Sequence, residues 1–472
     1  MGETGMGETS TDPVLVVSSD SHAGVPREQW PEYLPERFHE LLPALHADND
    51  EIYPRAIALL TAKADISSFS EHEEAHRDGW HGLHDPVLRM AEMDREGVAA
   101  ELVYLGDSRL GDMFCNVTQR DYGLEAWEVG AQGWNRWASD TFGFAKERFL
   151  VTGAIGPCVD MARTVAELEW ISDHGFAGTY GPGYMSHPDM PPLFDPYWEP
   201  FWATCEERGL AVVVHAGFGT MHGQVFPEVQ KMYDAAAQAA GSTDPAALMA
   251  HADAVSMDSM VFFDNWVNHN VASRRPMWQL MLGGVFDRHP RLKVILTEIR
   301  VDWIPATLAH LDKAFADAGA DRVADRAPSD YWQTNFLAGA SFIHKVEAEM
   351  CQEIGVEQIL FGRDYPHLEG TWPHTADWLR IAFNGVSEHD ARLMLGENAV
   401  RFLELDRQPL EEIARRIGPS IDSIVDGGTE IRPELLENFA NRGGFLKPAE
   451  GADRLPVVDT LFREDLEKAI AQ

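Results

Sequence analysis

The chain has 472 residues, 45% of them hydrophobic, which is enough to bury the core of one large catalytic domain. Asp and Glu outnumber Lys and Arg by 76 to 38, and the formal charge of −38 would repel nucleic acids and anionic membrane surfaces. We therefore expect neither nucleic acid nor membrane among its partners.

The N-terminal segment, residues 1–12, has the sequence "MGETGMGETSTD" and is predicted to be a flexible tail. It lacks the basic stretch followed by an apolar stretch that marks a secretion signal, and no run of about 18 apolar residues occurs in the chain. The cysteines lie far apart, without a Cys-x-x-Cys pair, and indicate neither a disulfide framework nor a thiolate zinc site. The sequence therefore predicts a cytoplasmic protein.

Eight short apolar runs follow along the chain, and most precede a helix-length stretch with apolar residues three or four positions apart. The helical stretches include "MARTVAELEWISDHG" and "DWIPATLAHLDKAF". The apolar runs are residues 15–19, 99–105, 149–155, 175–180, 211–215, 293–298, 335–340 and 358–362. Eight strand–helix alternations predict an α/β fold, a (β/α)8 TIM-like barrel that occupies residues 13–405.

Two connections are too long for simple crossovers: residues 24–85 after the first strand and residues 217–276 after the fifth. Both are predicted to emerge at the catalytic face. Within the second connection, residues 217–275 are rich in aromatic residues and Met. They predict either a lid-like insertion over a large ligand or a packing surface of a homodimer. Residues 406–472 are predicted to be a C-terminal extension, either helical or in contact with a partner.

Polar residues follow several of the predicted strands, and in a barrel such residues converge on one mouth. The first strand leads to Asp20 and His22, the fifth ends in "VVVHAG" with His215, and the eighth ends in "ILFGRDYPH" with Asp364 and His367. Residues i and i+2 of a strand share a face, so Asp20 and His22 can reach the same ion. Two imidazoles and two carboxylates can bind one divalent metal and leave a position for water. We predict Asp20, His22, His215 and Asp364 as its ligands.

One further histidine provides a contrast. His289, in "FDRHPRLKV", precedes a strand and therefore lies at the opposite end of the predicted barrel. We expect a helix-end or turn residue there and do not count it among the ligands.

Several motifs together carry a family resemblance: "SSDSHAGVPREQWPEYLPERF", "VVVHAG", "GGVFDRHPRLKVILTE", "DWIP" and "FGRDYPHLEGTWP". Over about residues 14–405 the chain resembles the amidohydrolase-related family that includes aminocarboxymuconate semialdehyde decarboxylase and other metal-dependent hydrolases and decarboxylases. The resemblance implies a metal-dependent barrel in which Asp20, His22, His215 and Asp364 are the ligands. It also implies that Asp364 takes a proton from the bound water.

The chain departs from this family at two strand ends. Relatives often open with His-x-His and carry a His after strand 6, where this chain has Asp20 and Glu298. Glu298 could orient a ligand histidine, act as a catalytic acid or base, or pair structurally with Arg300. His269, in the long insertion, is a candidate to replace the missing histidine.

The family resemblance also indicates how many metal ions to expect and of which element. Superfamily members with two metals usually bridge them with a carbamylated lysine at strand 4, but no lysine occurs between Lys146 and Lys231. One ion is therefore expected. Zinc is the expected metal, and the two ionised carboxylates would also suit manganese.

The sequence is compatible with three functions. The preferred one is hydrolysis, in which a metal-bound hydroxide attacks an amide- or amidine-like C–N bond of a small molecule or peptide-like natural product. The alternative is non-oxidative decarboxylation of an aromatic or unsaturated carboxylic acid, and the third is a non-catalytic barrel. Hydrolysis is preferred because only Arg300 and Arg363 offer positive charge to a leaving carboxylate. Tyr180, His269, Arg300 and His367 are predicted substrate contacts, and Asp364 and Glu298 the catalytic residues.

Overall fold

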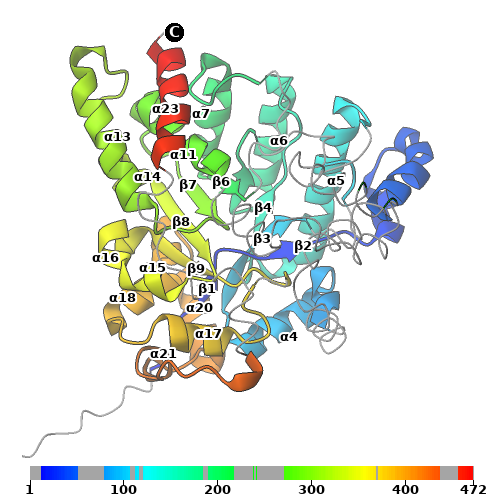
Figure 1. Cartoon of the computed structure of the whole chain (residues 1–472). Coiled ribbons are helices and arrows are strands. Elements are labelled where there is room, and N and C mark those ends of the chain that lie inside the picture. Colours follow the sequence, from blue (N-terminus) through cyan, green and yellow to red (C-terminus); the bar gives the residue numbers. More distant parts are fainter. Residues whose placement is uncertain are drawn as a thin grey trace, which may run out of the picture.

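The computed structural model describes residues 12–50, 79–106, 112–115, 121–183, 190–216, 271–367, 370–435 and 455–470, together with residues 238 and 241. Within them, parallel strands form a barrel in which neighbours follow the order β1-β3-β4-β5-β6-β7-β8-β9, with β2 also paired to β3 (Figure 1). The strands are β1 (Val17–Ser18), β2 (His22–Ala23), β3 (Ala100–Leu105), β4 (Phe149–Gly153), β5 (Gly178–Tyr180), β6 (Ala211–His215), β7 (Val294–Thr297), β8 (Phe336–Ser341) and β9 (Ile359–Gly362). The predicted TIM-like barrel is confirmed.

Backbone hydrogen bonds between the first and last strands close the barrel. The amide of Ser19 donates to the carbonyl of Phe361 at 2.8 Å, and the amide of His22 donates to the carbonyl of Tyr365 at 2.7 Å. The first strand is interrupted: Ser18 pairs with Glu101 and His22 with Tyr104, so three residues between β1 and β2 lie opposite two residues of β3. Asp20 therefore lies in a bulge, a feature that re-aims side chains.

Helices follow the strands and form the outer layer (Figure 1). The longer ones are α4 (Pro86–Glu96), α5 (Leu124–Phe142), α6 (Met161–Asp173), α7 (Glu199–Arg208), α11 (Val271–Leu282), α13 (Ile304–Ala318), α14 (Pro328–Asn335) and α17 (Thr375–Ala382). Shorter ones are α1 (Trp30–Tyr33), α12 (Val285–Arg288), α15 (Lys345–Glu349), α16 (Cys351–Ile354), α18 (Glu388–Arg392) and α19 (Asn398–Phe402). Local sequence fixes their starts: the side chains of Asp85 and Asp160 accept hydrogen bonds from the first amides of α4 and α6.

The core fills both faces of the sheet, because the barrel interior is packed and the helices cover the outside. Every residue of β3, β4, β6, β7 and β9 is buried. Gly339 of β8 shows how closely the interior packs, since a Cβ there would lie 2.5 Å from the hydroxyl oxygen of Ser19. Every helix in the described part of the chain is too short or too polar to cross a membrane.

The C-terminal extension is helical where the structure describes it, with α20 (Arg407–Ile417), α21 (Ile421–Val425) and α23 (Leu455–Ile470). Helix α23 packs on α11 and α13. Asp465 of α23 is buried and accepts hydrogen bonds from two Arg275 nitrogens at 2.7 Å each and from the indole of Trp278 at 2.9 Å. The predicted lid falls almost entirely on residues 217–270, which apart from residues 238 and 241 lie outside the described residues, as does His269.

Candidate metal centre

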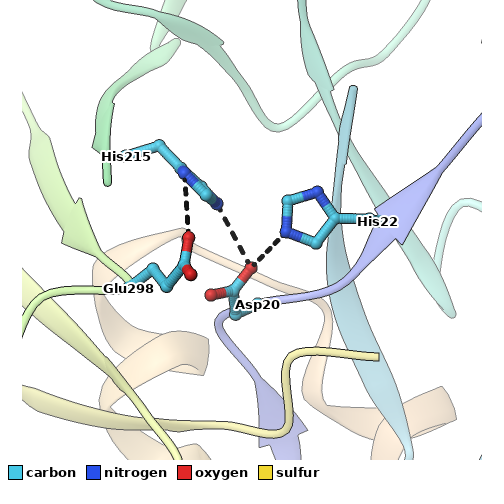
Figure 2. Close-up of side chains that lie close together, drawn as sticks. All are labelled: Asp20, His22, His215 and Glu298. Carbon is cyan, nitrogen blue, oxygen red and sulfur yellow. Dashed lines mark ion pairs between the residues drawn. The ribbon is translucent and has the colours of Figure 1, made fainter. Parts of the chain in front are cut away.

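Four side chains converge where the barrel strands end. Figure 2 shows Asp20, His22, His215 and Glu298 pointing toward one another from β1–β2, β6 and β7. His22 Nε2 lies 3.5 Å from Asp20 Oδ1, and His215 Nε2 lies 3.6 Å from the same oxygen. Asp364, directly after β9, adjoins them, with its Oδ1 3.4 Å from His22 Nε2. Asp20, His22, His215 and Glu298 form one group of potential ligands, and Asp364 forms a second group with His22 and His367. His22 is the predicted ligand that the two groups share.

These separations suit a common cation. Donor atoms bound about 2.1 Å from one ion at tetrahedral corners lie about 3.4 Å from each other. The observed separations of 3.4 to 3.6 Å agree with that spacing. Imidazole and carboxylate are also the donor types that divalent zinc and manganese accept. The residues present therefore fit one divalent ion.

Burial supports the same conclusion. Asp364 is fully buried, and His22 is 3% exposed. Among the described residues, neither ring nitrogen of His22 and neither carboxylate oxygen of Asp364 has a hydrogen-bond partner. Burying a charged or polar group without such a partner costs several kcal/mol, on the order of 2–7 for a neutral group. A bound cation would satisfy one ring nitrogen of His22 and the Asp364 carboxylate together.

The His22 imidazole is in the form that binds metals. Burial is the main cause that lowers its pKa well below the ordinary value, and the nearby His367 lowers it further. The ring is therefore neutral near pH 7 and has a lone pair to donate.

Glu298 lies beside His215, a predicted metal ligand. His215 Nδ1 lies 3.0 Å from the carbonyl of Ala216 and 3.2 Å from Glu298 Oε2. Because a carbonyl only accepts hydrogen bonds, Nδ1 carries the proton and Nε2 keeps the lone pair that faces Asp20. Of the three roles considered for Glu298, this geometry favours orientation of a ligand histidine.

A third histidine extends the site toward the surface. His367 Nδ1 lies 2.9 Å from Asp364 Oδ1, and the His367 ring stacks on the His22 ring with centroids 4.1 Å apart. Its side chain is 26% exposed, whereas that of Asp364 is fully buried. His367 therefore lies between Asp364 and the exterior.

The other predicted contacts lie in buried positions. The Tyr180 hydroxyl donates to the carbonyl of Leu105 at 3.1 Å, and the Tyr180 ring centroid is 6.4 Å from that of His215. Arg300 forms a two-bond ion pair with Asp302, at 3.0 Å for each bond.

His289, which was not counted among the ligands, ends α12 away from the cluster. It contacts Glu199 at 2.9 Å, as expected for a turn residue.

Two features of the site were not anticipated from sequence. Glu298 and Asp364 have left-handed backbones, with φ of 52° and 51°, a conformation that non-glycine residues adopt rarely and that clusters at functional sites. Tyr104 of β3 lies beside the cluster, with its ring centroid 5.2 Å from that of His215. Its presence in an apolar run, with a polar tip, is the only sequence signal that could have indicated this position.

Comparison with known proteins adds the family. Residues 75–405 match the sequence profile of the amidohydrolase family. The γ-resorcylate decarboxylase of a Rhizobium species is 27% identical over 270 residues, which cover 55% of this chain and 71% of that enzyme.

Solved structures share the fold. The 5-carboxyvanillate decarboxylase of Sphingomonas paucimobilis superposes with a TM-score of 0.54 at 17% identity, over 83% of this chain and 100% of that one. The corresponding enzyme of Novosphingobium aromaticivorans, determined in complex with manganese, gives a TM-score of 0.52 at 14% identity, over 84% of this chain and 100% of that one.

The expected reaction needs correction. The sequence favours C–N bond hydrolysis, but relatives that align with this chain over about 70% of their own length are decarboxylases. The preference was wrong because it depended on the count of cationic residues near the mouth. A bound metal ion can supply the positive charge that those residues were expected to supply.

Proposed function

This chain belongs to the amidohydrolase family, and on that basis we propose that it is a metal-dependent lyase that removes CO2 from a small aromatic carboxylic acid without an oxidant. The observation that carries the proposal is the buried group of Asp20, His22 and His215 at the strand ends, which Asp364 joins through its contact with His22. The similarity to γ-resorcylate decarboxylase supports the choice of reaction.

We assign Asp20, His22, His215 and Asp364 as ligands of one divalent ion. The carboxylate-rich donor set favours manganese, a harder ion than zinc, and a decarboxylase with the same fold has been determined with manganese. When bound, such an ion supplies positive charge that attracts the substrate's carboxylate or neighbouring hydroxyl and stabilises developing negative charge. Zinc, expected from sequence, is the alternative.

The reaction needs one proton at carbon. The bond between the ring carbon and the carboxylate breaks, its electron pair stays on the ring carbon, CO2 leaves, and a proton takes the place of the carboxylate. Asp364 is the proposed donor because it is buried at the site and its Oδ1 lies 2.9 Å from His367 Nδ1, so it can pass a proton from that histidine to the substrate. His367, 2.9 Å from Asp364 and partly exposed, is placed to replenish that proton from outside.

The remaining residues have supporting roles in this proposal. Glu298 keeps the proton on His215 Nδ1, so that Nε2 faces the ion. Tyr180 presents its ring to the substrate, since its hydroxyl is bonded to Leu105. Arg300, paired with Asp302, contributes to the shape of the mouth rather than to direct contact with the substrate carboxylate. From sequence alone we also propose that residues 13–405 form the barrel and residues 406–472 a C-terminal extension. We propose as well that the protein is a homo-oligomer and that it is cytoplasmic.

A panel assay tests the proposal. Protein reconstituted with Mn²⁺ is incubated with 2,6-dihydroxybenzoate, 5-carboxyvanillate and related hydroxybenzoates, and released CO2 is measured. Release that disappears after chelation and returns with Mn²⁺ supports the proposal. If the folded, metal-loaded protein releases no CO2 from any member of the panel, the assigned reaction is wrong.

A further inference from the structure

Two arginines and one glutamate are buried together beside the metal ligands. Arg89 of α4, Glu101 of β3 and Arg363, which follows β9, each have 0% exposure. Glu101 Oε1 accepts from Arg89 Nε at 2.5 Å, and Glu101 Oε2 accepts from Arg363 Nε and Nη2 at 2.9 and 2.7 Å. Both guanidinium groups also lie over the Tyr365 ring, at 4.0 Å for Arg89 and 4.7 Å for Arg363. One carboxylate thus fixes two cationic side chains from different elements.

This network reaches the backbones of the proposed ligands. Arg89 Nη1 donates to the carbonyl oxygen of His22 at 2.7 Å. Arg363 directly precedes Asp364, and its amide donates at 2.9 Å to the hydroxyl of Ser18, which in turn donates to the carbonyl of Asp20 at 2.8 Å. Glu101 is therefore connected to the backbones of His22 and Asp20 through hydrogen bonds, and to Asp364 through the chain at Arg363.

Residues 370–371 also contact the backbone of Arg363 and Asp364. The amide of Thr371 donates to the carbonyl of Arg363 at 2.9 Å. A Cβ at Gly370 would lie 2.5 Å from the carbonyl oxygens of both Arg363 and Asp364, so only glycine allows this close approach. The backbone of Arg363 and Asp364 is confined by residues 370–371, and the Arg363 side chain is fixed by Glu101.

The charges also complement the metal site. Asp20, Asp364 and Glu298 place three buried carboxylates around a site for one divalent ion, which leaves one excess negative charge. Two guanidinium groups and one carboxylate leave one excess positive charge in the neighbouring network. Burial by itself would raise the pKa of Glu101, but Arg363 and Arg89 together hold it below its ordinary value. Buried charges are tolerated when they are paired in this way.

We propose that Glu101 is a positioning residue of the metal centre. Through Arg89 and Arg363 it fixes the separation of His22 and Asp364, and thereby the affinity for the divalent ion. This inference rests on the ligand assignment of the proposed function. It assigns a metal-binding role to residues that lie outside the ligand set.

The test compares the affinity for Mn²⁺ with thermal stability, in the wild type, Glu101→Gln and Glu101→Asp. Affinity is measured by competition with a fluorescent chelator, without any substrate. We expect Glu101→Gln to weaken Mn²⁺ binding by about 10- to 100-fold, as is typical when a residue that supports metal ligands is changed. Glu101→Asp keeps the charge and should recover part of the affinity.

The matched control is Asp465→Asn. Asp465 is another buried carboxylate that binds an arginine through two hydrogen bonds, but it lies on α23, where it contacts α11. This variant should lose thermal stability and keep the wild-type affinity for Mn²⁺. If it loses as much affinity as Glu101→Gln, general destabilisation explains both variants and the inference is wrong.

Two further outcomes are decisive. A folded Glu101→Gln protein with wild-type Mn²⁺ affinity overturns the inference while the proposed function stands, whereas a wild type that binds no divalent ion overturns the ligand assignment itself. If Glu101→Gln does not fold, Arg89→Lys replaces it, because this change keeps the charge but removes guanidinium contacts. A wild-type Mn²⁺ affinity in Arg89→Lys overturns the inference.

Discussion

The backbone amide of Asp364 donates a hydrogen bond of 3.1 Å to the carbonyl of Asp20, and so joins the end of the last barrel strand to the end of the first. Both residues are fully buried and both belong to the proposed ligand set. Closure of the barrel and assembly of the metal site therefore occur at the same place. An ion bound to this proposed set would link the ends of the first and last strands.

This relationship predicts that metal stabilises the fold. A ligand that binds only the folded state adds about 2.7 kcal/mol when its concentration is a hundred times its dissociation constant. We expect Mn²⁺ to raise the thermal unfolding midpoint of chelated protein in a concentration-dependent way. Differential scanning calorimetry checks this, with Mg²⁺ as the comparison ion. An unfolding midpoint that does not respond to Mn²⁺ would argue against a site at the closure.

Replacement of His215 by Ala should remove the ion. The variant loses the imidazole whose Nε2 lies 3.6 Å from Asp20 Oδ1, so we expect bound metal, measured by elemental analysis, to fall to a small fraction and activity to disappear. His289→Ala is the matched control, because His289 is also a buried histidine but contacts Glu199 away from the cluster. Equal metal loss in both variants would mean that His215 has no special role.

The Asp364→Asn variant distinguishes two roles of Asp364, metal binding and proton donation. Asparagine has nearly the same shape and tolerates the left-handed backbone of this position, where φ is 51°, but it cannot donate an acidic proton. We expect measurable metal and a loss of turnover of at least about 10²-fold, the lower range for positioned acid–base catalysis. Glu298→Gln, which changes only the orientation of His215, should lose about tenfold. Near-normal turnover of metal-loaded Asp364→Asn would transfer the proton-donor role to His367 or Glu298.

The positions of the ligands could be predicted from sequence because the strand–helix alternation fixes where strands end. Asp20, His22, His215 and Asp364 each follow an apolar run, and parallel strands in a barrel present these ends at one mouth. The bulge at Asp20 was not predictable, since it depends on the register between β1–β2 and β3.

The buried ionic network of Arg89, Glu101 and Arg363 could not be predicted from the sequence. Arg89 lies in a helix with many charged residues, where a solvated side chain is the ordinary interpretation, and Glu101 is a single charge inside an apolar run. Their burial depends on Arg363, a partner distant in sequence. The reaction was also beyond prediction, because imidazole and carboxylate donors serve metal-dependent hydrolysis and decarboxylation alike.

A buried carboxylate in α15 predicts how stability depends on pH. Glu347 accepts hydrogen bonds from the amides of Val301 at 2.6 Å and His344 at 2.8 Å. Burial would raise its pKa, but the hydrogen bond with His344 and nearby positive charge lower it to about 2. Since an unfolded Glu has a pKa of about 4.3, this carboxylate adds stability that is complete above that pH and is lost as pH falls toward 2.

We therefore expect the difference in unfolding free energy between the wild type and Glu347→Gln to be constant above about pH 5 and to narrow below about pH 4.3, by at most about 3 kcal/mol. Urea titrations at a series of pH values measure it. Glu349→Gln, an exposed neighbour on the same helix, is the control and should show only a small difference. A difference for Glu347→Gln that does not change with acidification would disprove the role assigned to this carboxylate.

The most direct test of decarboxylation is the mass spectrum of the product formed in D2O by Mn²⁺-loaded protein from the hydroxybenzoate panel. Proton transfer to the carbon that loses CO2 predicts a product that lacks the carboxylate and carries one deuterium in its place, and no such product after chelation. Recovery of every acid unchanged by folded, metal-loaded protein, or formation of a product that has instead gained the elements of water, would contradict the proposed reaction.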